Sequence, residues 1–334
     1  METESARLAA LKIWLSAQLD GQVFDLASAS SDAGFRRYFR ASFAGETRIV
    51  MDAPPDKEDC RPFLHVAELM RAASVHVPEV YATDLDQGFL LLSDLGPTTY
   101  LQALNADNAN ELFRAATDSL LRWQLASRTN VLPPYDEALL RRELALFPDW
   151  YVARHLGIRL SEAQSQTLTA AFSLIVENNL AQPRVYVHRD YMPRNLMLCD
   201  PNPGVLDFQD AVHGPITYDV ACLFKDAFIS WPEERVLDWL VRYWEKAKRA
   251  GLPVNHDFGQ FYRDVEWMGL QRHLKVLGIF ARLNYRDGKS HYLTDAPRFV
   301  QYVRAVAGRY NGLGPLLRLL DEIEGRQVKV GYTF

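Results

Sequence analysis

The N-terminal part of the chain, up to residue 94, carries short apolar and alternating runs, which predict β-strands. These runs span residues 22–26, 35–43, 48–51, 77–82 and 88–94. The last run is nearly all apolar, which indicates a central strand buried on both faces. Helices are predicted for residues 1–19 and 62–73, and Pro62 stands at a position that is favoured at helix starts. This part of the sequence therefore predicts a small, strand-rich lobe.

Beyond residue 98 the pattern changes to apolar residues spaced three and four apart, which predicts helices. Such patterns cover residues 109–127, 162–178, 233–250, 258–283 and 296–323. We therefore predict an α+β protein of two lobes. The small N-terminal lobe spans residues 1–93, a hinge spans 94–97, and a large, mostly helical C-terminal lobe spans 98–334.

An island of strand interrupts the helical lobe in the stretch VYVHRDYMPRNLMLCDPNPGVLDFQD, residues 185–210. Its apolar runs are very short, and DPNPG is dense in turn residues. If 196–199 and 205–206 pair as an antiparallel hairpin, Asn195 starts one strand and Asp207 ends the other at the same open end. Asp190 lies on the loop just before them. We therefore expect the three polar side chains to converge.

This set of oxygen-bearing side chains suits phosphoryl transfer. Magnesium prefers one or two carboxyl or carbonyl oxygens together with substrate phosphates. We expect Asn195 and Asp207 to hold Mg²⁺, and Asp190 to act as the base that accepts the proton of an acceptor hydroxyl. His188 and Arg189 would support the loop. The alternative is that these polar side chains cap turns and satisfy backbone donors.

The spacing H-R-D-x-x-x-x-N followed by L-D-F resembles the catalytic and metal-binding loops of protein-kinase-like enzymes. The forms VHRDYMPRNLM and VLDFQDAVHGPITYDVACL resemble the aminoglycoside phosphotransferase and choline kinase superfamily. In that superfamily the aspartate of Y-D, here Asp219, braces the catalytic loop. With the stretches 31–41, 48–70, 88–101 and 269–298, the chain most resembles the branch of anomeric N-acetylmuramate and N-acetylglucosamine kinases.

The resemblance covers nearly the whole chain and implies both a fold and an activity. The fold is bilobal and protein-kinase-like, with a nucleotide-binding N-terminal lobe. The activity is ATP- and Mg²⁺-dependent phosphorylation of the anomeric hydroxyl of the amino sugar. The product would be the α-1-phosphate, formed during peptidoglycan recycling.

The N-terminal lobe departs from the protein-kinase pattern at its phosphate-binding residues. Protein kinases carry a lysine on the third strand, paired to a helix glutamate, whereas RIVMDAPP holds none and the phosphate loop holds only Gly34. We expect Arg36, Arg37 or Lys57 to supply the missing charge; alternatively, the two arginines lie on a solvated strand edge. Glu68 stands where the partner glutamate is expected, or is an ordinary surface acid.

The nucleotide base is expected to bind at the hinge. Backbone groups of Ser93, Asp94 and Leu95 follow the apolar run of the central strand and would contact adenine. Backbone recognition leaves little side-chain signature, so ATP as the nucleotide rests on the resemblance.

The acceptor site is expected in the helical lobe, facing the predicted base. Arg272, Lys275 and Arg282 recur at spacings of three and seven on one face of an apolar helix. This basic stripe would bind a carboxylate such as the lactyl group of N-acetylmuramate, or it is a solvated face. Asp226 and Trp231 are candidates to bind sugar hydroxyls and to cover a sugar face.

Composition limits the partners and the compartment. The 334 residues carry a net charge of −5, which gives no electrostatic reason to bind nucleic acid or an anionic membrane. The sequence shows neither a signal peptide nor about 18 consecutive apolar residues. Cys60, Cys199 and Cys222 are odd in number and widely spaced, which predicts reduced thiols in a cytoplasmic protein. No obligate protein partner is implied.

Other functions stay open at this point. Within the superfamily the acceptor could be an aminoglycoside, choline or homoserine. The missing strand lysine also permits a pseudokinase that binds nucleotide without transferring phosphate, although the base and both metal ligands are intact. A nucleic-acid-binding module is disfavoured by the acidic balance.

Overall fold

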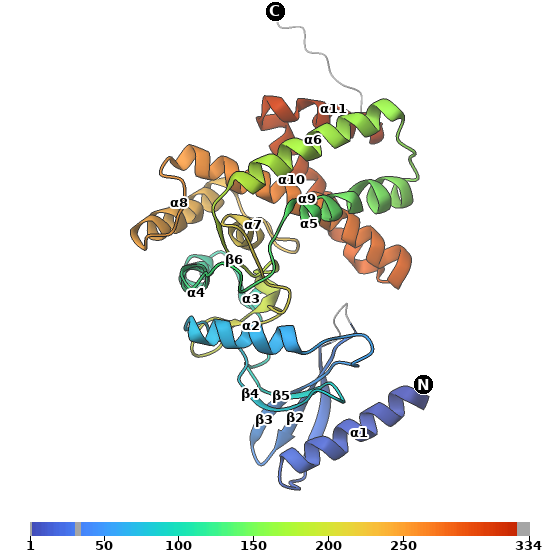
Figure 1. Cartoon of the computed structure of the whole chain (residues 1–334), viewed down its shortest axis with the longest axis vertical. Helices are drawn as coiled ribbons and strands as arrows, with labels where there is room; N and C mark the ends of the chain where they lie inside the picture. The colour runs from blue at the N-terminus through green and yellow to red at the C-terminus, as the bar shows by residue number, and fades with distance from the viewer. Residues whose placement is uncertain (1, 31–34, 326–334) are drawn as a thin grey trace, which may run out of the picture. The chain divides into compact units, whose positions relative to one another are not determined.

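The computed structural model describes residues 2–30 and 35–325 of the chain. It forms two compact units, one of Met1–Trp123 with Arg194–Asp210 and the other of Gln124–Pro193 with Ala211–Phe334 (Figure 1). Gly34 and the start of the predicted phosphate loop lie outside the described residues. A small antiparallel sheet and a larger helical portion confirm the predicted α+β class.

A five-stranded antiparallel sheet forms the centre of the first unit. Its order is β1 (Asp25–Ser30), β2 (Arg37–Phe43), β3 (Glu46–Asp52), β5 (Phe89–Ser93) and β4 (Val80–Asp84). The predicted central strand is confirmed, because β5 lies between two neighbours and is buried along most of its length. The first strand lies further along the chain than the prediction at 22–26, since β1 begins only at Asp25.

Two helices accompany this sheet, α1 (Glu2–Gln18) and α2 (Arg61–Ala72). Leu11 and Leu15 of α1 pack in one cluster with Val50, Phe89 and Leu91 of the sheet. Because side chains alternate along a strand, the intervening buried residues of β3 and β5 point to the opposite face. In Figure 1, α2 runs along the side of the sheet away from α1.

The predicted hairpin at 196–206 also belongs to the first unit and is shorter than expected. Strands β7 (Leu196–Met197) and β8 (Gly204–Val205) pair antiparallel. The N–H of Leu206 donates to the carbonyl of Asn195 at 2.9 Å, which extends the pairing by one bond. The short helix α3 (Tyr100–Ala103) and the start of α4 (Ala109–Leu125) complete the unit.

The second unit is mostly helical. Its helices are α5 (Glu137–Leu146), the π-helical segment η1 (Phe147–His155), α6 (Glu162–Ala181), α7 (Tyr218–Phe224), α8 (Glu233–Arg249), α9 (Phe258–Asp287), α10 (Ala296–Arg309) and α11 (Gly314–Ile323). The long helix α9 contacts α5, α6, α7, α8 and α10, and is buried over most of its length. Strands β6 (Arg184–Val187) and β9 (Val212–Pro215) pair beside these helices.

The single helix predicted over 296–323 is wrong. Helix α10 ends at Arg309, Tyr310 adopts an extended conformation, and α11 begins at Gly314 after a short 3₁₀ turn. The sequence NGLGP explains the break, because Pro315 is suited to a helix start and cannot continue a helix interior.

None of the helices within the described ranges is both long enough and apolar enough to cross a membrane.

Candidate active site

The loop that carries Asp190 follows β6 and is fixed by a buried carboxylate. Asp219, near the start of α7, accepts the backbone N–H of His188 at 2.7 Å and that of Arg189 at 3.0 Å. Arg189 has a φ of +78°, in the left-handed region that side chains other than glycine rarely adopt. The two hydrogen bonds therefore hold a strained turn at the start of this loop.

His188 supports the same loop from inside. Its side chain is buried, and Nδ1 accepts the N–H of Asp190 at 3.2 Å. The ring meets Tyr191 edge to face, with 5.6 Å between centroids. The His188 side chain thus contacts the backbone that carries Asp190.

The two aspartates of this loop have opposite pKa shifts. Burial raises the pKa of Asp219 to about 7, against the two N–H donors that favour its charged form. Burial would also raise the pKa of Asp190, but the positive charges of Lys275, Arg272 and Arg189 outweigh it and hold that pKa below its ordinary value. Two carboxyl groups driven apart in this way often have different roles in one site. Asp190 is therefore ionised at neutral pH.

Two of the cations near Asp190, Arg189 and Lys275, form ion pairs with Glu143 of α5. The sequence analysis did not identify Glu143. Its buried carboxylate pairs with Arg189 at 2.6 Å and with Lys275 at 2.9 Å, and it accepts the hydroxyl of Tyr135. Lys275 also donates to the hydroxyl of Tyr218 at 3.2 Å. The sequence does contain a sign of this buried acid. Glu143 lies between Leu140 and Leu144, which places a carboxylate on an apolar helix face.

Close packing of α5 on α9 brings Glu143 and Lys275 together. A Cβ on Gly278 of α9 would lie only 2.3 Å from the carbonyl oxygen of Leu146, so this contact requires glycine. Nearby, Gln271 donates from Nε2 to the carbonyl of Leu140 at 2.9 Å. Lys275 therefore lies in a buried ion-pair cluster, and its charge is already matched by Glu143.

Asp226 and Arg272 lie in the same unit and are both almost completely buried, at 1% and 3% exposure. Oδ2 of Asp226 accepts the N–H of Phe228 at 3.3 Å, whereas Oδ1 has no hydrogen-bond partner among the residues described. Arg272 contacts the sulfur of Met192 through Nη2 at 3.6 Å, and its Nη1 likewise has no partner there. Met192 in turn donates its N–H to the carbonyl of Asp190 at 2.9 Å. Both predicted acceptor residues therefore carry an unused polar atom, and Arg272 reaches the Asp190 loop.

Trp231 and Arg282 were also predicted for the acceptor site, but no contact described here joins either of them to the Asp190 loop. Trp231 packs edge-on against Trp239 with 5.4 Å between centroids, and the guanidinium of Arg235 lies 5.0 Å from its ring. Arg282 stands ten residues beyond Arg272 on α9, about 15 Å along the helix axis at 1.5 Å per residue. The predicted basic stripe is therefore divided, because only its first two residues lie near the Asp190 loop.

The predicted metal ligands meet in the first unit. Asn195 donates from Nδ2 to Oδ2 of Asp207 at 3.3 Å, and Gln209 donates to Oδ1 at 2.9 Å. The predicted pairing of Asn195 with Asp207 across the hairpin end is therefore present. Asp190 belongs to the other unit, and its convergence with this pair stays a prediction.

The chemistry of these two donors fits magnesium. Carboxylate and amide oxygens are hard ligands, and magnesium commonly takes one or two of them while phosphate and water supply the rest. Over residues 2–30 and 35–325 no group of three or more His, Cys, Asp or Glu side chains gathers into an all-protein metal site. Asn195 and Asp207 thus suit a cation that arrives with a phosphate ligand.

Arg37, a candidate for the phosphate-binding charge, forms an ion pair with a buried carboxylate. Asp52, at the end of β3, is fully buried and bonds Arg37 through Oδ2 and Arg7 through Oδ1. An aspartate therefore stands in the RIVMD segment where the strand lysine was sought.

The other residues predicted to bind phosphate or to pair with the phosphate-binding cation are Arg36, Lys57 and Glu68. Arg36 pairs with Glu58 at 2.8 Å. Lys57 is exposed, with its Nζ 5.0 Å from the centre of the Phe35 ring. Glu68 lies on an exposed face of α2, and no ion pair joins it to a described lysine or arginine.

The hinge residues are fixed by their own hydrogen bonds. Asp94 binds Arg40 through both oxygens, at 2.5 and 3.0 Å, and accepts the N–H of Gly96. The backbone N–H of Ser93 donates to the carbonyl of Glu79 at 2.9 Å. Leu95 is buried. The Asp94 side chain is therefore committed to hydrogen bonds within this segment, and base binding by the backbone here stays a prediction.

Comparison with known protein families finds one match. The model of the phosphotransferase enzyme family matches residues 25–254. The chain is 55% identical over 331 residues to an N-acetylmuramate/N-acetylglucosamine kinase of Pseudomonas aeruginosa, covering 96% of this chain and 98% of the relative. It is 53% identical over 334 residues to the kinase of the same name from Pseudomonas putida, covering 97% and 98%.

Solved structures with a similar fold share much less sequence. An ADP-bound aminoglycoside phosphotransferase aligns with a TM-score of 0.58 at 15% identity, covering 88% of this chain and 97% of that one. A choline kinase from Streptococcus pneumoniae aligns with a TM-score of 0.64 at 14% identity, covering 91% and 100%. These likenesses establish the protein-kinase-like fold and leave the acceptor to be argued from the site.

Proposed function

Because the chain belongs to the phosphotransferase enzyme family, we propose that it is an ATP-dependent kinase of N-acetylmuramate and N-acetylglucosamine. The phosphate goes to the anomeric hydroxyl, and the α-1-phosphate returns to cell-wall synthesis as part of peptidoglycan recycling. Two relatives more than half identical over nearly their whole length carry this name. The observation that carries the proposal is the position of Asp190, ionised and partly buried, on a loop braced by Asp219.

Asp190 acts as the general base in this proposal. As the sugar oxygen forms its bond to the γ-phosphorus, the bond from that phosphorus to the β,γ-bridging oxygen breaks and ADP leaves. Asp190 accepts the hydroxyl proton late in this step. Asp219 and His188 contribute by fixing the backbone on either side of the base. Arg189 and Lys275, tied to Glu143, keep the carboxylate charged.

Asn195 and Asp207 are proposed to hold Mg²⁺. When bound, the cation offsets the negative charge of the phosphates. The supporting observation is that the hairpin β7–β8 sets the amide and the carboxylate within hydrogen-bond distance at one end. Gln209 holds the other carboxylate oxygen and so fixes the orientation of Asp207.

The nucleotide is proposed to bind to the N-terminal lobe, residues 1–93, and the hinge at 94–97. An ADP-bound neighbour of the same fold supports an adenine nucleotide. The N–H of Ser93 already bonds Glu79, so the base would contact the Ser93 carbonyl and the backbone of Asp94 and Leu95. Arg37 is the candidate that we favour for the phosphate charge, and the C-terminal lobe, residues 98–334, would hold the acceptor.

Product analysis tests the proposal directly. The purified protein is incubated with ATP, Mg²⁺ and N-acetylmuramate or N-acetylglucosamine, and a phosphorus spectrum distinguishes an anomeric phosphate from one on a primary alcohol. The same assay with an aminoglycoside, choline and homoserine tests the other acceptors of the superfamily. Nucleotide binding without turnover of any acceptor would instead support a pseudokinase.

The place of action that we propose is the cytoplasm. ATP is available there, and the three cysteines Cys60, Cys199 and Cys222 are unpaired, as expected where thiols stay reduced. The proposed reaction needs the amino sugar and ATP and requires no protein partner.

A further inference from the structure

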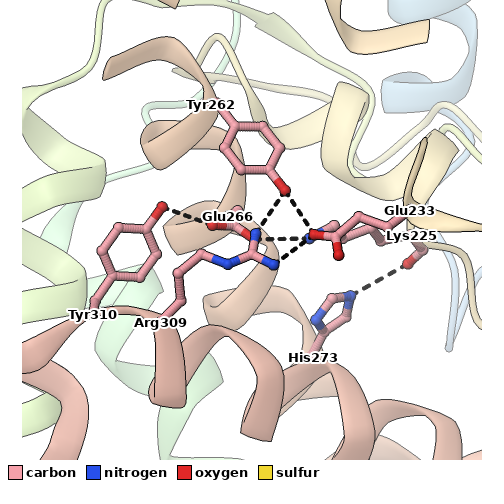
Figure 2. Close-up of polar contacts among 7 residues, drawn as sticks. All are labelled: Lys225, Glu233, Tyr262, Glu266, His273, Arg309 and Tyr310. Atoms are coloured by element: carbon pink, nitrogen blue, oxygen red, sulfur yellow. Dashed lines mark hydrogen bonds and ion pairs between the residues drawn. The ribbon is translucent and has the colours of Figure 1, made fainter. Parts of the chain in front are cut away.

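An ion network with a buried centre involves Lys225, the residue before Asp226 in the sequence (Figure 2). Its centre is Glu266 of α9, which is 1% exposed and accepts Lys225 at 3.4 Å, Arg309 at 2.6 Å and Tyr310 at 2.6 Å. We call it the Glu266 network; its members are Lys225, Glu233, Tyr262, Glu266, Arg309 and Tyr310. Lys225 is the neighbour of Asp226 in sequence, yet its charge is committed to Glu266 and not to Asp226.

The backbone on both sides of Asp226 is fixed as well. His273 donates from Nε2 to the carbonyl of Lys225 at 3.3 Å, as Figure 2 shows. Arg298 of α10 donates to the carbonyl of Ala227. The ring of His273 stacks on Tyr302 with 4.8 Å between centroids. The loop therefore presents Asp226 in a set position while the nearby cations Lys225 and Arg298 bind other groups.

Two of the buried polar atoms without a hydrogen-bond partner belong to residues predicted for the acceptor site. They are Oδ1 of Asp226 and Nη1 of Arg272, both without a hydrogen-bond partner among the described residues. The two side chains form no ion pair with each other, although each is almost completely buried. Buried polar groups without partners are costly, so their retention is expected where a ligand supplies the missing bonds.

The chemistry of this pair matches a secondary amide, which offers one N–H donor and one carbonyl acceptor. In both sugars of the proposed function the anomeric carbon is bonded to C2, which carries an acetamido group. Arg272 contacts Met192, whose N–H bonds the carbonyl of Asp190, so Arg272 lies close to the predicted base. The positive charge of Arg272 also acts on the carboxyl group of Asp226. The lactyl carboxylate is attached at C3, one carbon further away, and only N-acetylmuramate carries it.

We infer that Asp226 and Arg272 recognise the 2-acetamido group of the sugar, with Asp226 accepting its N–H and Arg272 donating to its carbonyl. This inference rests on the proposed function. The Glu266 network acts as a positioning element that keeps Lys225 away from Asp226. Arg272 thus binds the acetamido group that both sugars carry, and not the lactyl carboxylate that only N-acetylmuramate carries.

Sugar selectivity tests the inference. We compare kcat/KM for N-acetylglucosamine, glucose and 2-deoxyglucose in the wild-type enzyme and in Asp226→Asn, Asp226→Ala and Arg272→Lys. A site built to hydrogen-bond a group rejects analogues without it by about 10⁴-fold, so wild type should prefer N-acetylglucosamine at least a hundredfold. In each variant this preference should fall at least tenfold. Equal use of all three sugars by wild type would overturn the inference, whether or not the variants fold.

Two comparisons separate the remaining outcomes. A loss in Arg272→Lys confined to N-acetylmuramate would assign Arg272 to the lactyl carboxylate and overturn its role here. Absence of phosphorylation of any sugar by wild type would contradict the proposed function, whereas turnover with unchanged selectivity in the variants would contradict only the inference.

The positioning role has its own test and a matched control. Glu266→Gln should raise KM for N-acetylglucosamine at least fivefold with little change in KM for ATP, because Lys225 is released toward Asp226. Asp321→Asn breaks a comparable ion pair, that of Arg304 on α10 with α11, and should leave both KM values unchanged. If the two substitutions changed the KM values equally, the Glu266 network would have only a structural role and would not position Asp226.

Discussion

Arg37 and Asp52 form a close ion pair in the N-terminal unit. Nη2 and Nε of Arg37 lie 2.5 and 3.0 Å from Oδ2 of Asp52, and Nε of Arg7 lies 2.6 Å from Oδ1. Two guanidinium groups therefore meet one buried carboxylate at the end of β3. In protein kinases a strand lysine supplies positive charge for the phosphates, and Asp52 stands in the strand segment where that lysine was sought.

Substitution of Arg37 is therefore expected to impair the use of ATP. Arg37→Ala should raise KM for ATP and lower kcat, while KM for the sugar barely moves. Arg37→Lys should restore only part of the loss, because an ammonium cannot form the planar two-point contact of a guanidinium. Steady-state kinetics with each substrate varied in turn measure these effects.

Arg36→Ala and Lys57→Ala are the matched comparisons. Arg36 is paired with Glu58 and Lys57 is exposed, whereas Arg37 shares the carboxylate of Asp52 with Arg7. Both substitutions should therefore affect ATP use less than Arg37→Ala. If Lys57→Ala alone raised KM for ATP, the phosphate-binding role would belong to Lys57. If none of the three did, the charge would come from another residue.

The base is tested by Asp190→Asn. The substitution preserves size but removes the proton acceptor, so kcat should fall by about 10²–10⁴. Nucleotide affinity should stay almost unchanged, because the base contacts only the acceptor. Single-turnover rates and a nucleotide-binding titration measure the two quantities. A variant that kept more than half of the wild-type kcat would show that Asp190 is not the base.

Replacing the proposed metal ligands should change the magnesium dependence of the reaction. Asp207→Ala should be the more damaging substitution because it removes the charged ligand, whereas Asn195→Ala should recover part of its activity at high magnesium. Rates measured over a magnesium series give an apparent affinity for each variant. Normal turnover of Asp207→Ala at low magnesium would contradict the assignment.

The sequence predicted those parts of the site whose residues are close together in the chain. Asp190, Asn195 and Asp207 fall within one stretch, and the turn residues between the strands indicated the hairpin that joins Asn195 to Asp207. Asp219 follows twelve residues after Asp207, and its expected bracing role rested on the family resemblance. The central strand β5 was predictable because a strand buried on both faces needs an apolar run.

Contacts between distant segments could not be predicted in this way. Arg7 and Asp52 are 45 residues apart, and no local pattern connects them. Likewise, Lys275 was interpreted as part of a basic face until the packing of α9 on α5 placed it against Glu143. A charge on an apolar helix face has the same sequence signature whether its partner is a ligand or a buried acid.

Glu143 is predicted to contribute strongly to stability. Its removal leaves the buried cations Arg189 and Lys275 without their shared partner, and breaking a buried ion pair typically costs about 3–5 kcal/mol. Glu143→Gln should therefore lower the melting temperature clearly. Glu137→Gln breaks the exposed pair with Arg141 on the same helix, worth only about 0.3–0.5 kcal/mol, and is the matched control. Similar melting temperatures for the two variants would contradict the prediction.

Asp219 should make stability depend on pH in an unusual direction. Burial raises its pKa in the folded protein to about 7, above the ordinary value near 3.8. The folded state therefore binds the proton more tightly than the unfolded state. The stability that this group contributes is full below its unfolded pKa and is lost as pH rises through about 7.

The measurement is the melting temperature of wild type and of Asp219→Asn between pH 5 and pH 8. The substituted amide does not titrate, but it offers only one acceptor oxygen to the two N–H groups of His188 and Arg189. Wild type should therefore have its largest advantage at pH 5, and that advantage should shrink toward pH 8. An advantage that grew with pH would mean that the two N–H donors outweigh burial, and that Asp219 is charged throughout this range.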